Sequence, residues 1–167
     1  AAPSSTIGIH HPSGAIKKIS FDDDPAVVTT STINGVTSDP GGVWRVVWDR
    51  NTTTEGGSSG SPLFNQNGQI IGQLWGGNAS CFNSGTGHDF YGRLFNSWEP
   101  SGSSNSGQLK YWLDPTNSGS VSIGGYDPYN SPTDYNASVQ TISGQEGKEC
   151  LSSFTPSVDI LNKGVQT

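Results

Sequence analysis

Turn-forming residues interrupt this chain so often that long helices are excluded. Glycine accounts for 23 of its 167 residues and proline for 10, and Ser, Thr and Asn fill much of the sequence between them. The apolar stretches that remain are short and rich in Val, Ile, Trp and Phe, a composition typical of strands. We therefore predict an all-β protein of short strands joined by many turns.

The pattern predicts about six antiparallel strands followed by one helix. The strands are expected over residues 7–9, 15–21, 26–33, 43–48, 62–65, 69–75 and 90–95. The Gln66-Asn67-Gly68 turn predicts a hairpin. Residues 108–114 carry Leu109, Trp112 and Leu113 on one helical face, which indicates a short amphipathic helix. Strands and a closing helix in this number make one small barrel.

The composition changes after residue 115. Residues 116–133 are rich in Gly, Ser, Asn and Pro, which predicts a linker between a first domain (1–115) and a tail (134–167). The tail shows two further strand patterns, at 138–142 and 157–161. Two strands cannot bury a core. We therefore expect the tail to be the beginning of a second β domain that continues past Thr167.

Charge and apolar patterning exclude several classes of partner. The net charge is −6 and only 8 residues are Lys or Arg, which argues against nucleic acid. No apolar run approaches the length of a membrane span, so no membrane partner is expected. The chain lacks methionine, so we expect that it does not begin at an initiator and that any signal peptide lies upstream or has been removed.

Cys81 and Cys150 are the only cysteines. They pair either with each other or with partners outside this chain. Two isolated cysteines lack the clustered spacing of a zinc site, so we expect no metal and no cofactor.

Residues 56–64 read GGSSGSPLF, and they carry the main functional signal. By itself such a string is a common Gly/Ser surface turn. One catalytic frame, G-x-S-x-G with Ser58 as nucleophile, requires a helix directly after the serine, whereas Pro62 and a strand follow. In the other frame Ser59 is the nucleophile of a trypsin-like site. The amides of Gly57 and Ser59 then form the oxyanion hole, and glycine at 57 permits the backbone geometry.

Further motifs place the chain beside a known family. They are IHHP at 9–12, GQLWGG at 72–77 with Ser80-Cys81, DFYGR at 89–93 and YWLD at 111–114. With GGSSGSPLF, they make residues 7–114 resemble the second half of a bacterial lysyl endopeptidase, a secreted protease of trypsin-like fold. The resemblance implies the second six-stranded antiparallel barrel of a two-barrel fold, with a short C-terminal helix. The tail resembles the first strands of an Ig-like module, a partial β-sandwich.

The resemblance assigns roles at matching positions. It implies Ser59 as the nucleophile, with the amides of Gly57 and Ser59 as the oxyanion hole. Leu74, Trp75 and Gly76 are implied as the edge strand that pairs with the substrate backbone. Asp89 is implied at the base of the primary specificity pocket, where a buried carboxylate selects lysine, with arginine as the second candidate.

Two departures concern positions 75 and 58. Trp75 stands where the lysyl endopeptidases have a histidine, and we expect it to pack along the substrate cleft rather than to catalyse. Ser58 stands where trypsin-like zymogens carry the aspartate that receives the new N-terminal amine. No ion pair of that kind can form here, a feature that lysyl endopeptidases share.

A serine nucleophile also requires a base and an orienting acid. The chain has three histidines, His10, His11 and His88, and each is interpreted as structural. The run 22–24 of three aspartates is interpreted as an exposed turn. In the family, the base, the acid and the partner of Cys81 come from the first barrel, N-terminal to Ala1.

Two classes of function remain. One is a serine endopeptidase that acts on polypeptides through Ser59, with this half requiring the N-terminal barrel of the same protease and inactive alone. The other is an inactive protease homologue that serves as a binding or adhesion module. The resemblance implies a secreted or extracellular bacterial protein in either case.

Overall fold

The structure is a computed structural model that describes residues 1–100, 102–123, 137–143 and 157–162, with side chains described up to residue 123. It divides the chain into two compact units, Ala1–Ile123 and Gly124–Thr167. The linker expected over 116–133 lies partly outside the described residues, and the predicted domain bounds stay a prediction.

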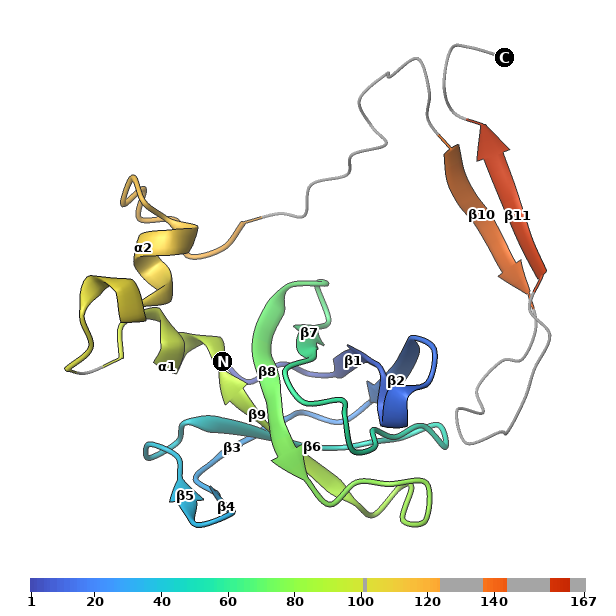
Figure 1. Ribbon diagram of the computed structural model, residues 1–167, viewed down its shortest axis with the longest axis horizontal. Helices are drawn as coiled ribbons and strands as arrows, with labels where there is room; N and C mark the ends of the chain where they lie inside the picture. The colour runs from blue at the N-terminus through green and yellow to red at the C-terminus, as the bar shows by residue number, and fades with distance from the viewer. Residues whose placement is uncertain (101, 124–136, 144–156, 163–167) are drawn as a thin grey trace. The chain divides into compact units, whose positions relative to one another are not determined.

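The first unit is built on one antiparallel sheet of seven strands, in the order β2-β1-β7-β8-β9-β6-β3 (Figure 1). The seven strands are β1 (Thr6–His10), β2 (Lys18–Asp22), β3 (Val27–Thr29), β6 (Val43–Val47), β7 (Pro62–Asn65), β8 (Ile70–Gly77) and β9 (His88–Arg93). A separate hairpin is formed by β4 (Thr32–Ile33) and β5 (Val36–Thr37).

The sheet curls back on itself. A β-bridge joins Phe21 in β2 to Asp49, which follows β6 closely, and the Asp49 N–H donates to the Phe21 carbonyl at 2.6 Å. Since β2 and β6 lie near opposite ends of the strand order, this bridge brings six strands into a ring, and β3 is added beside β6. The predicted all-β barrel fold class is confirmed.

Most of the expected strands are found, and the differences have local causes. The expected strand 26–33 is broken in two at Thr30-Ser31, because β3 pairs with β6 whereas β4 pairs with β5 across the Asn34-Gly35 turn, in which both residues have positive φ. The expected strand 90–95 begins earlier and ends at Arg93, and the short helix α1 (Leu94–Trp98) follows it. The hairpin over Gln66-Asn67-Gly68 joins β7 to β8 as predicted.

The core fills the inside of the ring. Its buried members are Ala26, Trp44, Val46, Trp48, Leu63, Leu74 and Tyr91. Trp48 and Tyr91 meet edge to face, with ring centroids 6.1 Å apart. Both rings press on Gly8, where an added Cβ would lie 2.9 Å from Trp48 Cη2. Glycine at this position of β1 therefore leaves room for Trp48 and for the Tyr91 hydroxyl, whose oxygen would lie 3.1 Å from such a Cβ.

The helical elements are short. Two 3₁₀ turns, η1 (Pro12–Gly14) and η2 (Asn105–Gly107), accompany α1 and the helix α2 (Leu109–Leu113). The helix predicted over 108–114 is thus present, but its apolar residues remain largely exposed, 69% for Trp112 and 62% for Leu113. In the described part of the chain, no helix combines the length and apolar character that crossing a membrane requires.

The second unit is described as a two-stranded antiparallel ladder. Its strands are β10 (Ala137–Ser143) and β11 (Ser157–Asn162), with a break in register between Val139 and Thr141. Both strands predicted in the tail are therefore found. The Ig-like assignment stays a prediction.

One prediction about the aspartate run is wrong. Asp22 is the last residue of β2 and only 3% exposed, because alternation along the strand turns it to the same inner face as Ser20. Its carboxylate accepts hydrogen bonds from the Thr6 hydroxyl at 3.4 Å and the Asp24 N–H at 3.2 Å. Burial raises the pKa of Asp22 to about 6, and the negative charges of Asp49 and Asp24 add to the increase.

This raised pKa makes stability depend on pH. The folded chain holds a proton on Asp22 between pH 3.8 and about 6 that the unfolded chain releases. The contribution of Asp22 is therefore full below pH 3.8 and is lost as pH rises through about 6. We expect Asp22→Asn to remove about 2–3 kcal/mol of this decline. Urea unfolding at pH 4 and pH 7 measures this decline. If the free energy of unfolding fell by the same amount between the two pH values in the unaltered protein and in Asp22→Asn, the assignment would be contradicted.

Candidate functional site

The two adjacent serines of GGSSGSPLF, Ser58 and Ser59, differ in exposure. They lie in the loop between β6 and β7. Ser58 is buried, at 2% exposure, whereas Ser59 is exposed to solvent. Among the described residues, the Ser59 hydroxyl has no hydrogen-bond partner. Of the two serines, Ser59 is therefore the one that a substrate can reach, in agreement with the frame chosen from the sequence.

In the part of the chain that the structure describes, the turn at Ser58 has an amide without an acceptor on each side. The Ser58 N–H donates to the Glu55 carbonyl at 3.1 Å, which closes a turn, and the Gly60 N–H donates to the Leu74 carbonyl at 2.7 Å. Within the described chain, no acceptor is found for the N–H of Gly57 or of Ser59. Gly57 has φ +91°, a conformation in which a side chain would be strained. Two free amides on either side of a bonded one can hold an oxyanion.

A chain of buried hydrogen bonds lies beneath the loop. His10, at the end of β1, is 1% exposed and contacts serines through both ring nitrogens. Its Nδ1 lies 3.1 Å from Ser58 Oγ and its Nε2 lies 2.8 Å from Ser20 Oγ. The Ser20 hydroxyl in turn donates to the Thr53 carbonyl at 2.9 Å. We call these four residues the His10 relay.

The His10 relay resembles a catalytic triad in connectivity but not in access. A nucleophile must meet its substrate, and both Ser58 and His10 are enclosed. The structural interpretation of His10 fits this burial. His11 is exposed and contacts the Ala15 carbonyl, and His88 packs edge to face on Phe90. In the described chain, no hydrogen bond joins the Ser59 hydroxyl to His10, His11 or His88.

Asp89 is buried beneath the same loop. It lies in β9 and is 2% exposed. Its Oδ2 accepts hydrogen bonds from Trp48 Nε1 at 2.7 Å and from the Thr54 hydroxyl. Thr54 belongs to the loop that carries Ser59, so the carboxylate is tied directly to that loop. Burial raises the pKa of Tyr91 well above its ordinary value, and Asp89 adds to this increase, so the Tyr91 phenol stays neutral beside the site.

The end of β8 lies against Asp89. Gly77 faces Asp89 in the β8–β9 register, and a Cβ on Gly77 would lie 2.3 Å from Asp89 Oδ1. Only glycine allows the strand to pass so close to the carboxylate. The serine loop, the end of β8 and Asp89 therefore meet at one end of the barrel.

The predicted substrate strand is only partly open. The Leu74 N–H donates to the Ser61 carbonyl at 2.8 Å, and its own carbonyl accepts from Gly60, so both backbone groups are engaged. The β7 pairing of β8 ends at Gln73. Trp75 and Gly76 thus extend past β7, with β9 on one side and, among the described residues, no strand on the other.

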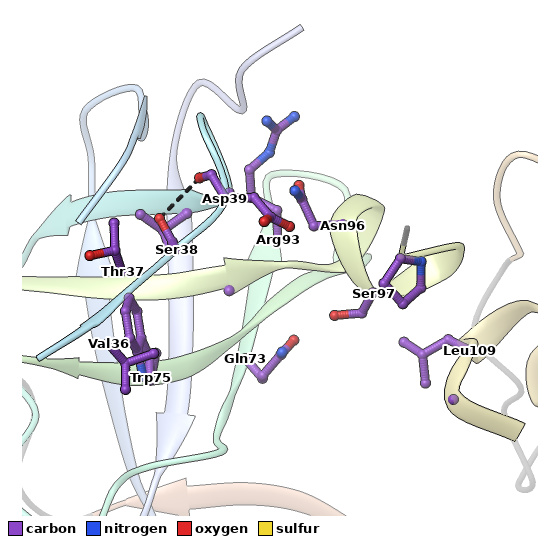
Figure 2. A pocket seen from close by; sticks show the side chains of 15 residues that line it. Val36, Thr37, Ser38, Asp39, Gln73, Trp75, Arg93, Asn96, Ser97 and Leu109 are labelled. Atoms are coloured by element: carbon purple, nitrogen blue, oxygen red, sulfur yellow. Dashed lines mark hydrogen bonds between the residues drawn. The ribbon is translucent and has the colours of Figure 1, made fainter. Parts of the chain in front are cut away.

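Trp75 also lines an open pocket of about 580 Å³ (Figure 2). The pocket lies between the β4–β5 hairpin, the strands β8 and β9, and the helical segment that begins with α1. Arg93 is on its wall and stacks on the Trp44 ring, with the guanidinium carbon 4.6 Å from the ring centroid. The indole of Trp75 thus belongs to a hollow beside the open part of β8, as expected for a residue that packs rather than catalyses.

Other predicted site residues lie nearby or outside the description. The Cys81 N–H donates to Glu55 Oε1 at 2.6 Å, which ties the loop before β9 to the serine loop. Cys150 lies outside the described residues, so the pairing of the two cysteines stays a prediction. No group of three or more metal-binding side chains is found in the part of the chain that the structure describes.

The comparisons with known proteins can now be set beside this geometry. The family model described as "Lysyl endopeptidase, C-terminal domain" matches residues 1–92, more than half of the chain. The chain belongs to this family. The matched residues of this lysyl endopeptidase C-terminal domain contain the serine loop, β8 and Asp89. Membership makes it part of a serine protease family, hydrolases that act on polypeptides.

One solved structure is similar to this lysyl endopeptidase C-terminal domain at low identity. It is Rv3671c from M. tuberculosis H37Rv, solved as an inactive-form serine-to-alanine mutant, with 18% identity and a TM-score of 0.38. The match covers 74% of this chain and 52% of that one, so the chain spans about half the length of that protein.

Sequence reasoning missed the partners of the two buried polar groups. Trp48 and Thr54 were not assigned to Asp89, and Ser58 and Ser20 were not assigned to His10. One signal was available: Thr6, Gly8 and His10 share the inner phase of β1, so His10 had to point inward and find polar partners. Which partners these are depends on contacts across 48 residues for Ser58 and could not be read locally.

The hydrogen bond from Thr54 to Asp89 gives a stability prediction. Thr54→Val keeps the shape of the side chain but removes a donor from a buried carboxylate. We expect it to cost about 1.5–3 kcal/mol, the range for a hydrogen bond to a charged group. Thr86→Val is the control, because Thr86 is exposed and its hydroxyl donates to the Asn83 carbonyl. Its cost should stay within about 0.5 kcal/mol in urea unfolding, and equal costs would argue against the bond.

Proposed function

We propose that this chain is the nucleophile-bearing half of a secreted serine endopeptidase that cleaves polypeptides after lysine, with arginine as the second candidate. Ser59 attacks the scissile carbonyl, and the N–H groups of Gly57 and Ser59 hold the oxyanion that forms. The base takes the Ser59 proton and passes it to the leaving amine, which leaves an acyl-enzyme for water to hydrolyse.

One observation carries this proposal. A buried carboxylate, Asp89, is hydrogen-bonded to the loop that presents the exposed Ser59, and the N–H groups of Gly57 and Ser59 in this loop have no acceptor in the described chain. A solvated turn of the same composition needs neither the carboxylate nor the free amides. The combination supplies a nucleophile, an oxyanion site and a specificity charge at one end of the barrel.

The preference for a cation follows from burial. A carboxylate with 2% exposure has lost most of its water, and its Oδ2 already accepts two protein donors. A lysine ammonium is a compact charge with three donors that can reach the remaining oxygen. An uncharged side chain there would leave the carboxylate without a counter-charge, which is costly.

The backbone of the substrate is proposed to pair with the open part of β8. Trp75 and Gly76 lie past the end of β7, so an extended peptide can add beside them as another strand. The pocket beside Trp75 then receives side chains that precede the cleaved bond.

The base and the acid are proposed to come from a barrel that precedes Ala1 in the same protease. His10 is the histidine next to the serine loop, and it is enclosed and bound to Ser58. Cys81 is proposed to pair with a cysteine of that barrel or with Cys150. Secretion by a bacterium suits such a bond, because disulfides persist in oxidising compartments.

The second candidate is an inactive homologue that binds or adheres. It has the same fold and family as the protease and differs only in lacking catalytic activity. The retained exposure of Ser59 and the burial of Asp89 favour the protease.

Labelling of Ser59 separates the two candidates. A fluorophosphonate probe should modify the complete protease at Ser59, and Ser59→Ala should abolish both the label and proteolysis. Ser58→Ala is the neighbouring control and should still be labelled. Labelling of the chain without any preceding barrel would mean that the base lies in this chain, and absence of labelling in the complete protein would support the binding module.

Replacement of Asp89 tests the specificity. Asp89→Ala should lower kcat/KM for lysyl amides by about 30-fold to several thousand-fold, since truncating one partner of a buried charge pair costs about 2–5 kcal/mol. The fluorophosphonate reaction, which needs no lysine, should fall much less. Thermal unfolding controls for loss of fold. Unchanged lysyl cleavage would exclude Asp89 as the specificity residue.

A further inference from the structure

The His10 relay holds both ends of the segment that leads to Ser59. One ring nitrogen of His10 contacts Ser58 directly, and the other reaches Thr53 through Ser20. Both ends of the segment 53–58 are therefore held by one imidazole, directly at Ser58 and through Ser20 at Thr53. A further tie comes from η1, where the Ser13 N–H donates to the Gly56 carbonyl at 2.7 Å.

The directions of the hydrogen bonds fix the proton on the ring. Because the Ser20 hydroxyl gives its proton to the Thr53 carbonyl, Ser20 Oγ accepts from His10 Nε2. The other ring nitrogen, Nδ1, lies 3.1 Å from the Ser58 hydroxyl oxygen. All four groups are buried, so water cannot replace a lost member of the chain without cost.

The contacts of Ser58 determine which backbone N–H groups of the turn are available to a substrate. With its side chain held inward by His10 and its N–H bonded to Glu55, Ser58 anchors the middle of the turn. The N–H groups on either side, those of Gly57 and Ser59, are the ones left without acceptors in the described chain. Release of Ser58 would free the turn to rotate these two peptides.

From these contacts we propose that His10 is a positioning residue, which holds the serine loop in its working conformation through the contact of its Nδ1 with the Ser58 hydroxyl. The inference rests on the proposed function and deepens it. Position 58 here is uncharged, so the loop is ordered by an internal histidine and two hydroxyls.

Two variants of His10 separate its contacts. In His10→Asn the side-chain amide reaches the place of Nδ1 and can keep the contact with Ser58. In His10→Gln the longer amide reaches the place of Nε2, keeps Ser20 and removes the histidine partner of Ser58, whose hydroxyl oxygen then keeps, among the described residues, only the Glu55 N–H at 3.5 Å. A merely structural role makes no such distinction, because both variants disturb the same buried site.

The experiment measures kcat and KM on a lysyl amide in the complete protease. We expect His10→Gln to lower kcat by about 10- to 100-fold with KM within about twofold, because the oxyanion amides act on the transition state. Affinity for a lysyl boronate, which mimics the tetrahedral intermediate, should fall in parallel with kcat. His10→Asn should stay within about fivefold of the unaltered enzyme. Ser58→Ala should resemble His10→Gln, and adding it to His10→Gln should change little more.

A matched control accounts for lost stability. Thr6→Val removes a buried hydroxyl from the same strand, where it bonds Asp22 and not the serine loop. It should lower the melting temperature while leaving kcat unchanged. Equal losses of kcat in His10→Gln and His10→Asn, or a rise in KM alone, would overturn the proposal while the protease assignment stands. An unaltered enzyme that fluorophosphonate does not label would overturn the proposed function, and this inference with it.

Discussion

The site depends on one constraint, that a carboxylate removed from water must find hydrogen-bond donors. Asp89 meets it with Trp48, which belongs to the core of the barrel, and with Thr54, which belongs to the serine loop. The same two bonds therefore join the packing of the barrel to the placement of the loop. Gly77 passes close to Asp89 Oδ1, where any larger residue would collide with the carboxylate.

A second set of contacts, from His10 and Ser20, also holds the serine loop. His10 and Ser20 project inward from β1 and β2, and these strands are adjacent in the sheet. Their hydrogen bonds reach Ser58 and Thr53, so the loop is fixed between a histidine on one side and an aspartate on the other. Between these anchors, Ser59 and the amides beside it are left exposed. The contacts that order the loop therefore also leave Ser59 accessible.

Much of the fold could be predicted because its signals are local. The turn over Gln66-Asn67-Gly68 encodes the β7–β8 hairpin within a few residues. The break at Thr30-Ser31 lies inside a β-branched run with no Gly or Pro to mark it, so one strand was expected where the structure has two, β3 paired with β6 and β4 paired with β5. The prediction that Asp22 is exposed was wrong for another reason. Three consecutive acidic residues suggest exposure to solvent, whereas the alternation of β2 places Asp22 inside.

The sequence by itself determined the all-β class and the β7–β8 hairpin, and it predicted Ser59 rather than Ser58 as the nucleophile. These follow from residue types at short spacing, where proline, glycine and strand patterns act on neighbouring residues. Only the tertiary structure decided that His10 contacts Ser58 and that Thr54 donates to Asp89. It also decided that both backbone groups of Leu74 are already hydrogen-bonded. Such choices arise when a curled sheet brings distant strands together, because a buried polar group bonds whichever partner the fold places within reach.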